Sequence, residues 1–363
     1  MVMIKTFKYK AVVSQATRAH AEQWLWRCQQ IYNAALEQRI TAYKRCGITL
    51  TRFDQNNELP ELKSAFPEFK QVGSQVLQDV MARLDKAMKA FFRRLTSGQG
   101  KAGFPRFKSR ERYDSFTLSQ AGWKLDGRHL KIKGVGSFKL FLSRPIEGTI
   151  KTVTVRRDAC GDWWISFSCA VEAKVWAKPV KESVGIDVGL KHFCVDSDPG
   201  SQPIANPRYY QEQQAKLRKQ QRKVARRKKG SKRRKQAVKA LAKTHRKIVN
   251  LRRDFLHKTA NHYILNYQDI HVEALKVSSM VKNRHLSKAI SDASWALFFE
   301  ILLAKAEEAG RTVKKVPAHG TSQICSGCGE RVPKTLAVRV HHCTACGLVL
   351  DRDVNAALNI LAG

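Results

Sequence analysis

The sequence predicts a multidomain α+β protein, with helices followed by a run of strands in its first half and α/β layering in its second. The chain has 363 residues, of which 43% are hydrophobic, so it can build two or three domains with sizeable cores. The spacing of the apolar residues is helical before residue 100, alternates from Ser115 to Val171, and changes to strands separated by helices after Lys181.

The first hundred residues are expected to form one strand followed by helices. Basic and apolar residues alternate over Met1–Val13, which is typical of a strand. A broad apolar face at helical spacing follows from Thr17 onward and includes Trp24. A second helix ends at Ser97–Gly100, and the stretch Gly47–Pro67 between the two helices is expected to be mostly loop.

The alternation from Ser115 to Val171 predicts a small β-barrel, closed by the N-terminal strand. Within it, Val153–Arg157 and Trp163–Cys169 flank the tight turn Asp158–Asp162 and should pair as a hairpin. Small barrels of this kind often bind nucleic acid, although a fold alone does not establish that function.

The loop before these strands, Gly103–Arg110, interleaves two phenylalanines with cations. Such a mixture can stack on bases while Arg106 and Lys108 neutralise phosphates. A basic loop anchored by two buried rings would show the same pattern, so both interpretations remain open.

The second half begins with an acid inside an apolar strand. After a short linker, Ser183–Leu190 is expected to be a buried strand, and Asp187 should point to the face opposite Ile186 and Val188. A buried carboxylate is costly unless it is paired or bound to a metal. Because buried aspartates are rare, we interpret Asp187 as functional rather than structural.

The most basic stretch of the chain is Arg208–Arg253, which contains 20 Lys or Arg and one acid. It predicts a long helical hairpin that bends at Lys228–Ser231, with an apolar stripe on one side made of Val238, Leu241, Ile248, Leu251 and Phe255. A solvated surface is the simpler explanation, but charge of one sign at this density repels itself. A phosphate backbone would relieve that repulsion, and the contacts are expected from Arg226, Arg227, Lys228 and Lys229.

The charge of the whole chain also indicates a polyanionic partner. The formal net charge is +37, and removing the +19 of the basic stretch (20 minus 1) leaves +18 elsewhere. Nucleic acid fits better than a membrane surface, because no segment joins basic residues to a long apolar face. Neither a signal peptide nor an apolar run of about 18 residues is recognised, and we expect a cytoplasmic, nucleoid-associated protein.

Two CxxC pairs near the end of the chain predict a structural zinc ribbon. Cys325 and Cys328 are followed, after a 14-residue loop, by Cys343 and Cys346. Four thiolates in this spacing surround a tetrahedral ion and leave no open ligand position. Two disulfides would suit a secreted domain better. The other five cysteines show no ligand spacing and are expected to be ordinary thiols: Cys28, Cys46, Cys160, Cys169 and Cys194.

Two further acids complete a candidate catalytic set with Asp187. Glu273 ends the predicted strand Asp269–Leu275, and Asp353 begins the predicted helix Asp353–Leu361, where it could also act as a helix cap. In α/β layering these positions can converge, and three carboxylates can hold two Mg²⁺ ions about 4 Å apart for phosphodiester cleavage. Asp351 competes with Asp353 for the third place.

At these residues the chain resembles the TnpB family of transposon-encoded, RNA-guided nucleases, which is related to type V CRISPR effectors. The matching motifs are Gly185–Leu190, Val272–Val277, Thr321–Gly329 and Asp351–Ile360, and the loop Gly103–Arg110 is also similar. The resemblance implies that the acids at positions 187, 273 and 353 are RuvC-type catalytic residues that bind Mg²⁺. It also implies that the four-cysteine ribbon is the zinc insert of the nuclease domain.

The resemblance further implies a domain plan and partners. Residues 1–15 and 100–180 would form a β-barrel wedge domain, with a helical recognition domain inserted at 16–99. Residues 181–363 would form a RuvC-like (RNase H-like) α/β nuclease domain, containing the basic hairpin at 207–263 and the zinc ribbon at 320–349. The partners would be a guide RNA and double-stranded target DNA beside a short motif, with sequence choice delegated to base pairing. The oligomeric state is left open, with a monomer favoured.

Two other functions remain as alternatives. An RNA-guided repressor that binds without cutting would need a broken acid triad, whereas all three acids are present. A DNA transposase could use the same three acids to join strands, and metal chemistry alone does not exclude it.

Overall fold

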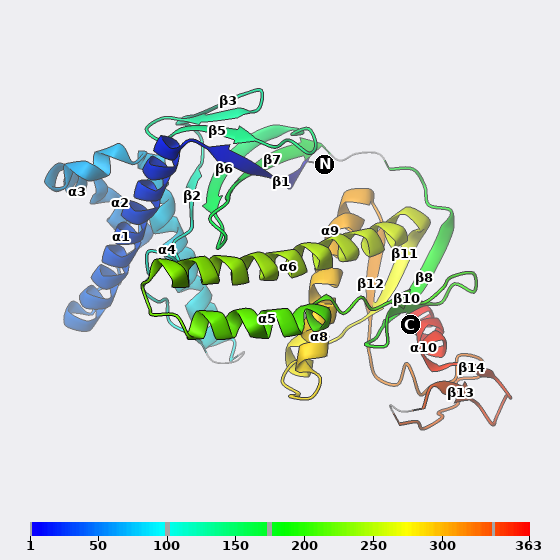
Figure 1. The fold of residues 1–363 in the computed structure, drawn as a ribbon. Coiled ribbons are helices and arrows are strands. Elements are labelled where there is room, and N and C mark those ends of the chain that lie inside the picture. The colour runs from blue at the N-terminus through cyan, green and yellow to red at the C-terminus, as the bar shows by residue number, and fades with distance from the viewer. Residues whose placement is uncertain (1, 99–101, 173–175, 336–337) are drawn as a thin grey trace. The chain divides into compact units, whose positions relative to one another are not determined.

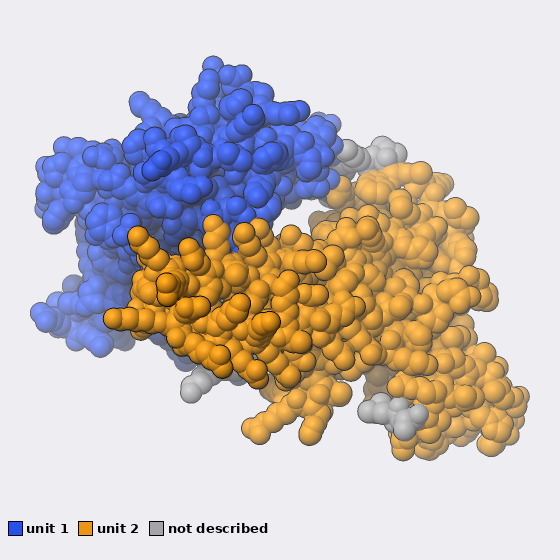
Figure 2. Space-filling model, viewed as in Figure 1, with its two compact units in different colours: residues 1–172 blue, residues 173–363 orange. Residues whose placement is uncertain are grey.

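The computed structural model describes all residues except 1, 99–101, 173–175 and 336–337. The chain divides into two compact units, residues 1–172 and 173–363, which are coloured separately in Figure 2. Each unit has its own apolar core. None of the helices in the described part of the chain is long and apolar enough to cross a membrane.

Unit 1 contains one curled seven-stranded sheet (Figure 1). Its strand order is β2-β6-β7-β1-β5-β4-β3, and every neighbouring pair is antiparallel. The strands are β1 (Val2–Val13), β2 (Ser115–Leu118), β3 (Trp123–Asp126), β4 (His129–Ile132), β5 (Gly136–Leu140), β6 (Thr149–Arg157) and β7 (Trp163–Glu172).

The N-terminal strand lies at the centre of this sheet rather than at a closing seam. Within β1, Ala11 pairs with Trp163 of β7 on one side and with Leu140 of β5 on the other. The predicted hairpin is confirmed: Arg157 pairs with Trp163 across the turn, where the Asp158 carboxylate accepts bonds from the backbone N–H groups of Cys160 and Asp162. β1 therefore joins two groups of strands, β2-β6-β7 on one side and β5-β4-β3 on the other.

The helices of unit 1 are α1 (Gln15–Cys46), α2 (Arg52–Asn57), α3 (Leu59–Ala65) and α4 (Ser74–Thr96), with a 3₁₀ turn at Pro67–Gln71. The expectation of mostly loop over Gly47–Pro67 was wrong, because α2 and α3 lie there. A capping box starts α2, in which Thr51 and Asp54 satisfy each other's backbone N–H groups. Trp24 of α1 is buried and packs against Phe116 of β2, with ring centroids 5.4 Å apart.

Unit 2 is built on a five-stranded sheet with the order β10-β9-β8-β11-β12. The central strands β8, β11 and β12 are parallel, while β9 and β10 are antiparallel to their neighbours. The strands are β8 (Lys181–Val188), β9 (His192–Asp196), β10 (Ile204–Ala205), β11 (Tyr267–Glu273) and β12 (Thr312–Val316). A small separate pair, β13 (Val340–His342) and β14 (Val349–Asp351), belongs to the cysteine-rich segment.

Helices cover both faces of the central strand β8. Tyr263 of α6 is buried on the face of Ile186, and α10 lies on the opposite face, at Gly185. The aromatic core joins Phe193 of β9 to Phe298 of α9, with ring centroids 5.2 Å apart. The helices of unit 2 are α5 (Tyr209–Ala225), α6 (Lys232–Asn266), α7 (Val277–Met280), α8 (Ser287–Ala293), α9 (Trp295–Ala309) and α10 (Arg352–Ala362).

The basic stretch forms the expected helical hairpin of α5 and α6, with its bend at residues 226–231 and Gly230 at a φ of 87°. The predicted apolar stripe was partly wrong, since Val238 and Leu251 are 43% and 36% exposed. α6 packs against α5 and α9, and the face that these contacts bury does not include Val238 or Leu251. The buried positions of α6 are Thr244, Ile248, Leu256, Thr259, Ala260, Tyr263 and Ile264.

Candidate functional site

Asp187 lies near the end of β8 and points to the face that α10 covers. Ile186 and Val188, on either side, are buried on the other face, as the strand alternation requires, and Asp187 itself is half-buried. Within the described residues, the structure records no hydrogen bond to the Asp187 carboxylate.

Gly185 explains how α10 comes so close to this strand. It shares a face with Asp187, and a Cβ placed on Gly185 would lie 2.1 Å from the carbonyl oxygen of Ala357 and 2.6 Å from the backbone nitrogen of Leu361. Only glycine permits this approach. The helix that carries Asp353 is therefore seated directly on the strand that carries Asp187.

Glu273 ends β11, the parallel neighbour of β8. The register pairs Val272 with Ile186, so the next residues along, Glu273 and Asp187, lie at the same level of adjacent strands. The Glu273 side chain is buried, and its Oε1 accepts a 2.6 Å hydrogen bond from the hydroxyl of Thr321. Burial raises the pKa of Glu273, and the Thr321 hydrogen bond opposes that rise.

Asp353 occupies the first turn of α10 but does not cap it. The cap is the exposed Asp351, whose carboxylate accepts the backbone N–H of Asp353 at 2.8 Å. Asp353 is 8% exposed, and its carboxylate accepts hydrogen bonds from Arg352 at 2.7 and 3.0 Å. A second guanidinium, that of Arg339, lies 3.8 Å from Asp353. The two candidate acids of this helix thus have different environments.

The charges of the three acids act on one another. Burial holds the pKa of Asp187 well above its usual range, and the negative charges of Glu273 and then Asp353 raise it further. The guanidinium of Arg352 opposes this rise. The fold has therefore gathered carboxylates from β8, β11 and α10 into one cluster, although they stand far apart in the sequence.

This cluster has the donor chemistry of a hard divalent cation. Carboxylate oxygens are the ligands that Mg²⁺ and Mn²⁺ prefer, and a bound cation would relieve the mutual repulsion of the acids. Among the described residues, only one group of three or more His, Cys, Asp or Glu side chains has all its ligand atoms within 4.8 Å, and that group is formed by cysteines. The acids are spread more widely than that.

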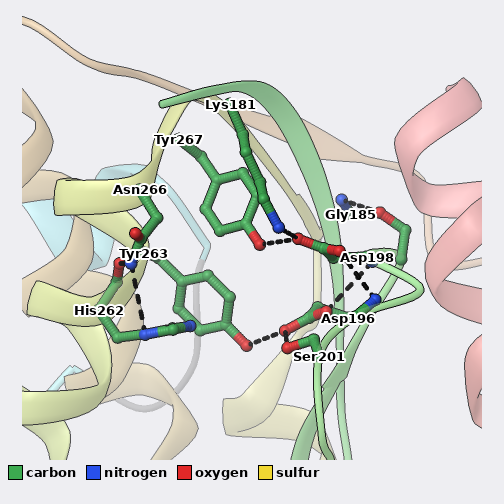
Figure 3. Close-up of polar contacts among 11 residues, drawn as sticks. Lys181, Gly185, Asp196, Asp198, Ser201, His262, Tyr263, Asn266 and Tyr267 are labelled. Atoms are coloured by element: carbon green, nitrogen blue, oxygen red, sulfur yellow. Dashed lines mark hydrogen bonds and ion pairs between the residues drawn. The ribbon is translucent and has the colours of Figure 1, made fainter. Parts of the chain in front are cut away.

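A second pair of acids, Asp196 at the end of β9 and Asp198 in the loop that follows it, makes a separate set of polar contacts (Figure 3). Asp196 of β9 is buried and accepts hydrogen bonds from the hydroxyls of Tyr263 at 3.0 Å and Ser201 at 2.8 Å. Asp198 accepts a 2.5 Å hydrogen bond from the hydroxyl of Tyr267 and forms an ion pair with Lys181. The Lys181 ammonium, with Tyr267, lowers the pKa of Asp198 to about 2. Both acids are paired: Asp196 joins the sheet to α6 through Tyr263, and Asp198 joins β8 to β11 through Lys181 and Tyr267.

The four cysteines of the predicted ribbon come together, with all four sulfurs within 4.8 Å of one another. Two of the sulfur pairs, Cys325–Cys346 and Cys328–Cys343, are 3.6 Å apart. Sulfurs bound tetrahedrally to one zinc at about 2.3 Å would have about this spacing. The donor set therefore fits a metal ion with four thiolate ligands. The other five cysteines lie outside this cluster, and all except Cys46 are buried.

The predicted nucleic-acid residues are exposed, except for the half-buried Lys108. Arg226, Arg227, Lys228 and Lys229 lie at the bend between α5 and α6. In the loop Gly103–Arg110 of unit 1, Phe104 and Phe107 are 43% and 52% exposed, so the interpretation with two buried rings was wrong. The loop is anchored instead through the backbone of Lys108, which exchanges hydrogen bonds with the Asn33 side chain at 2.8 and 3.0 Å. Arg106 is also exposed.

Sequence reasoning assigned no role to the polar residues that hold the acids in place. Thr321 binds Glu273 from 48 positions away, and Asn355, which is fully buried, binds Ile324 and Ser326. The sequence offers a weak local signal for each: Thr321 shortly precedes the first cysteine pair, and Asn355 is a polar residue on the buried side of a helix. The partner of each is decided by the fold.

Two family models match the chain. Residues 166–284 match a family described as "Probable transposase" (OrfB_IS605), and residues 295–360 match the "Cas12f1-like, TNB domain" family. The first match includes the strands of Asp187 and Glu273, and the second includes the cysteine cluster and most of α10.

Several relatives align with most of the chain. A protein of Streptomyces pristinaespiralis named "Putative RNA-guided DNA endonuclease" is 33% identical over 99% of this chain and 89% of its own length. The "Putative RNA-guided DNA endonuclease InsQ" of Escherichia coli K12 is 30% identical over 100% of this chain and 92% of its own. "TnpB-like protein L79" of Acanthamoeba polyphaga mimivirus is 28% identical over 61% of this chain and 45% of its own.

Proposed function

This chain belongs to the TnpB family of RNA-guided DNA endonucleases, and from that premise we propose that Asp187, Glu273 and Asp353 are its catalytic acids. The reaction is hydrolysis of a DNA phosphodiester of the RuvC type, dependent on Mg²⁺ or Mn²⁺. The observation that carries the proposal is the placement of the three acids: β8 and β11 are in parallel register, and α10 is seated on Gly185. Burial of Asp187 and the charges of the other two acids raise the pKa of Asp187, which also supports the proposal.

The chain's own residues supply the ligands and set their orientation. When bound at such carboxylates, a divalent cation activates water and stabilises the leaving oxygen in phosphodiester cleavage. The burial of Glu273 and Asp353 keeps their oxygens in one place, and the Thr321 hydrogen bond favours the ionised form of Glu273. Asp187, which has no recorded hydrogen bond among the described residues, keeps its oxygens available to a cation.

Asp353 is preferred to Asp351 as the third acid because the two carboxylates differ in burial and in the interactions they make. Asp351 is exposed, and its carboxylate is engaged in capping α10. Asp353 is buried, and its charge raises the pKa of Asp187 more than the charge of Asp351 does. The guanidinium of Arg352, which donates to Oδ1 of Asp353, limits the net negative charge of the three acids.

The partners are a guide RNA and double-stranded target DNA, read beside a short motif. The excess of positive charge in both halves of the chain supports this assignment. We propose that Arg226, Arg227, Lys228 and Lys229, together with Arg106 and Lys108, contact phosphates. The structural zinc ion would be held by Cys325, Cys328, Cys343 and Cys346.

The domain plan is proposed on the same basis. The sheet of unit 1 is assigned as the wedge domain (residues 1–15 and 100–180), and the helices at 16–99 as the inserted recognition domain. Residues 181–363 are assigned as the nuclease domain, with the basic hairpin at 207–263 and the ribbon at 320–349. Three features support this plan: unit 1 has a curled sheet, α1 to α4 come between β1 and β2 in the sequence, and unit 2 has parallel strands.

The test is cleavage of a target plasmid by the protein loaded with guide RNA. Asp187→Ala, Glu273→Ala and Asp353→Ala should each lower the cleavage rate more than about 100-fold. Loss of a metal ligand should cost more than loss of a residue that only hydrogen-bonds to a ligand, which typically costs about 10- to 100-fold. Guided DNA binding should stay nearly unchanged. Asp351→Ala is the matched control and should retain cleavage, because its loss removes a cap and no ligand. Full cleavage by Asp353→Ala would remove that residue from the site.

The same assay separates the alternatives. A repressor would bind the target without cutting it, even with all three acids intact. A transposase would join a supplied transposon end to the plasmid, whereas an endonuclease yields cut DNA alone.

A further inference from the structure

Among the described residues, one side chain is hydrogen-bonded to the carboxylate of Glu273, and it comes from the segment that leads into the cysteine cluster. The hydroxyl of Thr321 donates a 2.6 Å hydrogen bond to Oε1 of Glu273, and both residues are only 9% exposed. A bond this short to a charged acceptor is among the stronger hydrogen bonds of proteins. It occupies one oxygen of the carboxylate and leaves the other free to bind a cation.

Thr321 is itself held by the helix that carries Asp353. The amide of Asn359 in α10 donates to the carbonyl oxygens of Thr321 at 2.8 Å and Ile324 at 2.7 Å. One turn earlier, Asn355 donates to Ile324 at 2.8 Å and accepts the backbone N–H of Ser326 at 2.9 Å.

These bonds attach the first cysteine pair to α10. Ser326 lies between Cys325 and Cys328, so the turn that presents these two sulfurs is bound to a fully buried asparagine. The turn before it is also closed, since the backbone N–H groups of Gln323 and Ile324 donate to the carbonyl of Gly320 at 2.8 and 2.9 Å. The position of Thr321 thus depends on α10 at one side and on the cysteine cluster at the other.

We propose that Thr321 is a positioning residue for Glu273, and that the first cysteine pair, attached to α10 through Asn355 and Asn359, holds it in place. The inference rests on the proposed function of Glu273 as a metal ligand. It assigns the cysteine cluster a role in the geometry of the acid site as well as in folding. Outer partners of metal ligands act in this way, by fixing the ligand's orientation.

The test compares Thr321→Val, which keeps the β-branched shape and removes the hydroxyl, with Thr321→Ser, which keeps the hydroxyl and removes a methyl group. Mn²⁺ binding to the guide-loaded protein is measured by electron paramagnetic resonance, without target DNA. Cleavage is measured in parallel as a function of Mg²⁺ concentration. Zinc content and guided DNA binding serve as controls on folding.

We expect Thr321→Val to weaken Mn²⁺ binding about 10- to 100-fold and to raise the Mg²⁺ concentration for half-maximal cleavage by a similar factor. Thr321→Ser should remain within about threefold of the wild type, because the donor is retained. Zinc content and guided DNA binding should be equal in all three proteins. Unchanged Mn²⁺ binding by Thr321→Val would overturn the inference, and so would equal losses in the Val and Ser variants, which would indicate packing alone.

Glu273→Gln, assayed beside them, separates this inference from the proposed function. If Glu273→Gln cleaves as the wild type does, Glu273 is not a ligand and both proposals fail. If Glu273→Gln is inactive while Thr321→Val behaves normally, only the positioning role of Thr321 is wrong.

Discussion

Asp187 and Asp196 are acids on adjacent strands with opposite roles. Asp196 is the more buried of the two, yet the hydroxyls of Tyr263 and Ser201 satisfy its carboxylate. Burial raises the pKa of Asp187, and the charges of Glu273 and Asp353 raise it further. Burial of an aspartate is therefore a weak sign of function by itself, and like-charged neighbours are the stronger sign.

Asp198 leads to a prediction about pH. Its pKa of about 2 lies below the ordinary value of 3.8, so its ionised form stabilises the fold above pH 4, and this contribution is lost as the pH falls toward 2. Asp198→Asn should lower the free energy of unfolding at pH 7 by about 1 kcal/mol, a modest value because the partner Lys181 is half exposed to solvent.

Urea unfolding followed by circular dichroism at pH 7, 5 and 3 checks this expectation. The difference between Asp198→Asn and wild type should be equal at pH 7 and 5 and smaller at pH 3. An equal difference at all three values would mean that the charge of Asp198 is not the source of the stabilisation.

At the scale of elements, the contact of α10 with β8 governs the acid cluster. Gly185→Ala would place a methyl group 2.1 Å from the Ala357 carbonyl, which is backbone and cannot rotate away. We expect a loss of about 1–3 kcal/mol in stability, as for overpacking elsewhere. We also expect a large loss of cleavage, since α10 must move and take Asp353 with it.

Gly200→Ala is the matched control for that substitution. Among the described residues, a methyl group at Gly200 would have one neighbour within 4 Å, the Asp198 carboxylate oxygen at an ordinary 3.6 Å. Thermal unfolding and plasmid cleavage should be near wild type for Gly200→Ala. Wild-type cleavage by Gly185→Ala would show that the acid site tolerates a displaced α10.

The cysteine cluster is a second element whose integrity can be tested. Removing one ligand from a closed four-thiolate site removes folding free energy. Cys343→Ser should therefore contain less than one zinc per chain by elemental analysis, and it should be digested faster in limited proteolysis. Cys46→Ser, at an exposed cysteine outside the cluster, should match the wild type in both measurements. A normal zinc content in Cys343→Ser would refute the zinc assignment.

At the scale of the whole molecule, the dominant property is the net charge of +37. The four cations at the bend between α5 and α6 are exposed, and replacing Arg226, Arg227, Lys228 and Lys229 with Gln removes up to four phosphate contacts. Each true contact contributes about −0.9 to the slope of log K against log salt on duplex DNA. The variant should bind nucleic acid more weakly, with a shallower slope that does not depend on guide sequence.

A charge-conserving variant, Arg226→Lys with Arg227→Lys, controls for changes other than charge. It should keep the wild-type salt slope in filter-binding titrations with guide RNA and with target DNA. If the Gln variant also keeps the wild-type slope on both, the bend is a solvated surface and not part of the binding face.

Patterns local in the sequence were sufficient to predict several features of this chain. The CxxC spacing located the cysteine cluster, and the alternation about Asp158–Asp162 located the hairpin of β6 and β7. The glycine and serine at the bend separated α5 from α6. These features depend on residues within a few positions of one another, or on a ligand spacing that a single ion requires.

Features that depend on distant partners could not be read in this way. The central place of β1, the exposure of Val238 and Leu251, and the capping of α10 by Asp351 follow from which surfaces meet in the folded chain. The sequence identified Asp187, Glu273 and Asp353 as candidates, while their common cluster depends on the parallel register of β8 with β11 and on Gly185 beneath α10. Hydrogen bonds such as that from Thr321 to Glu273 join residues whose separation carries no periodic signal, so packing alone selects them.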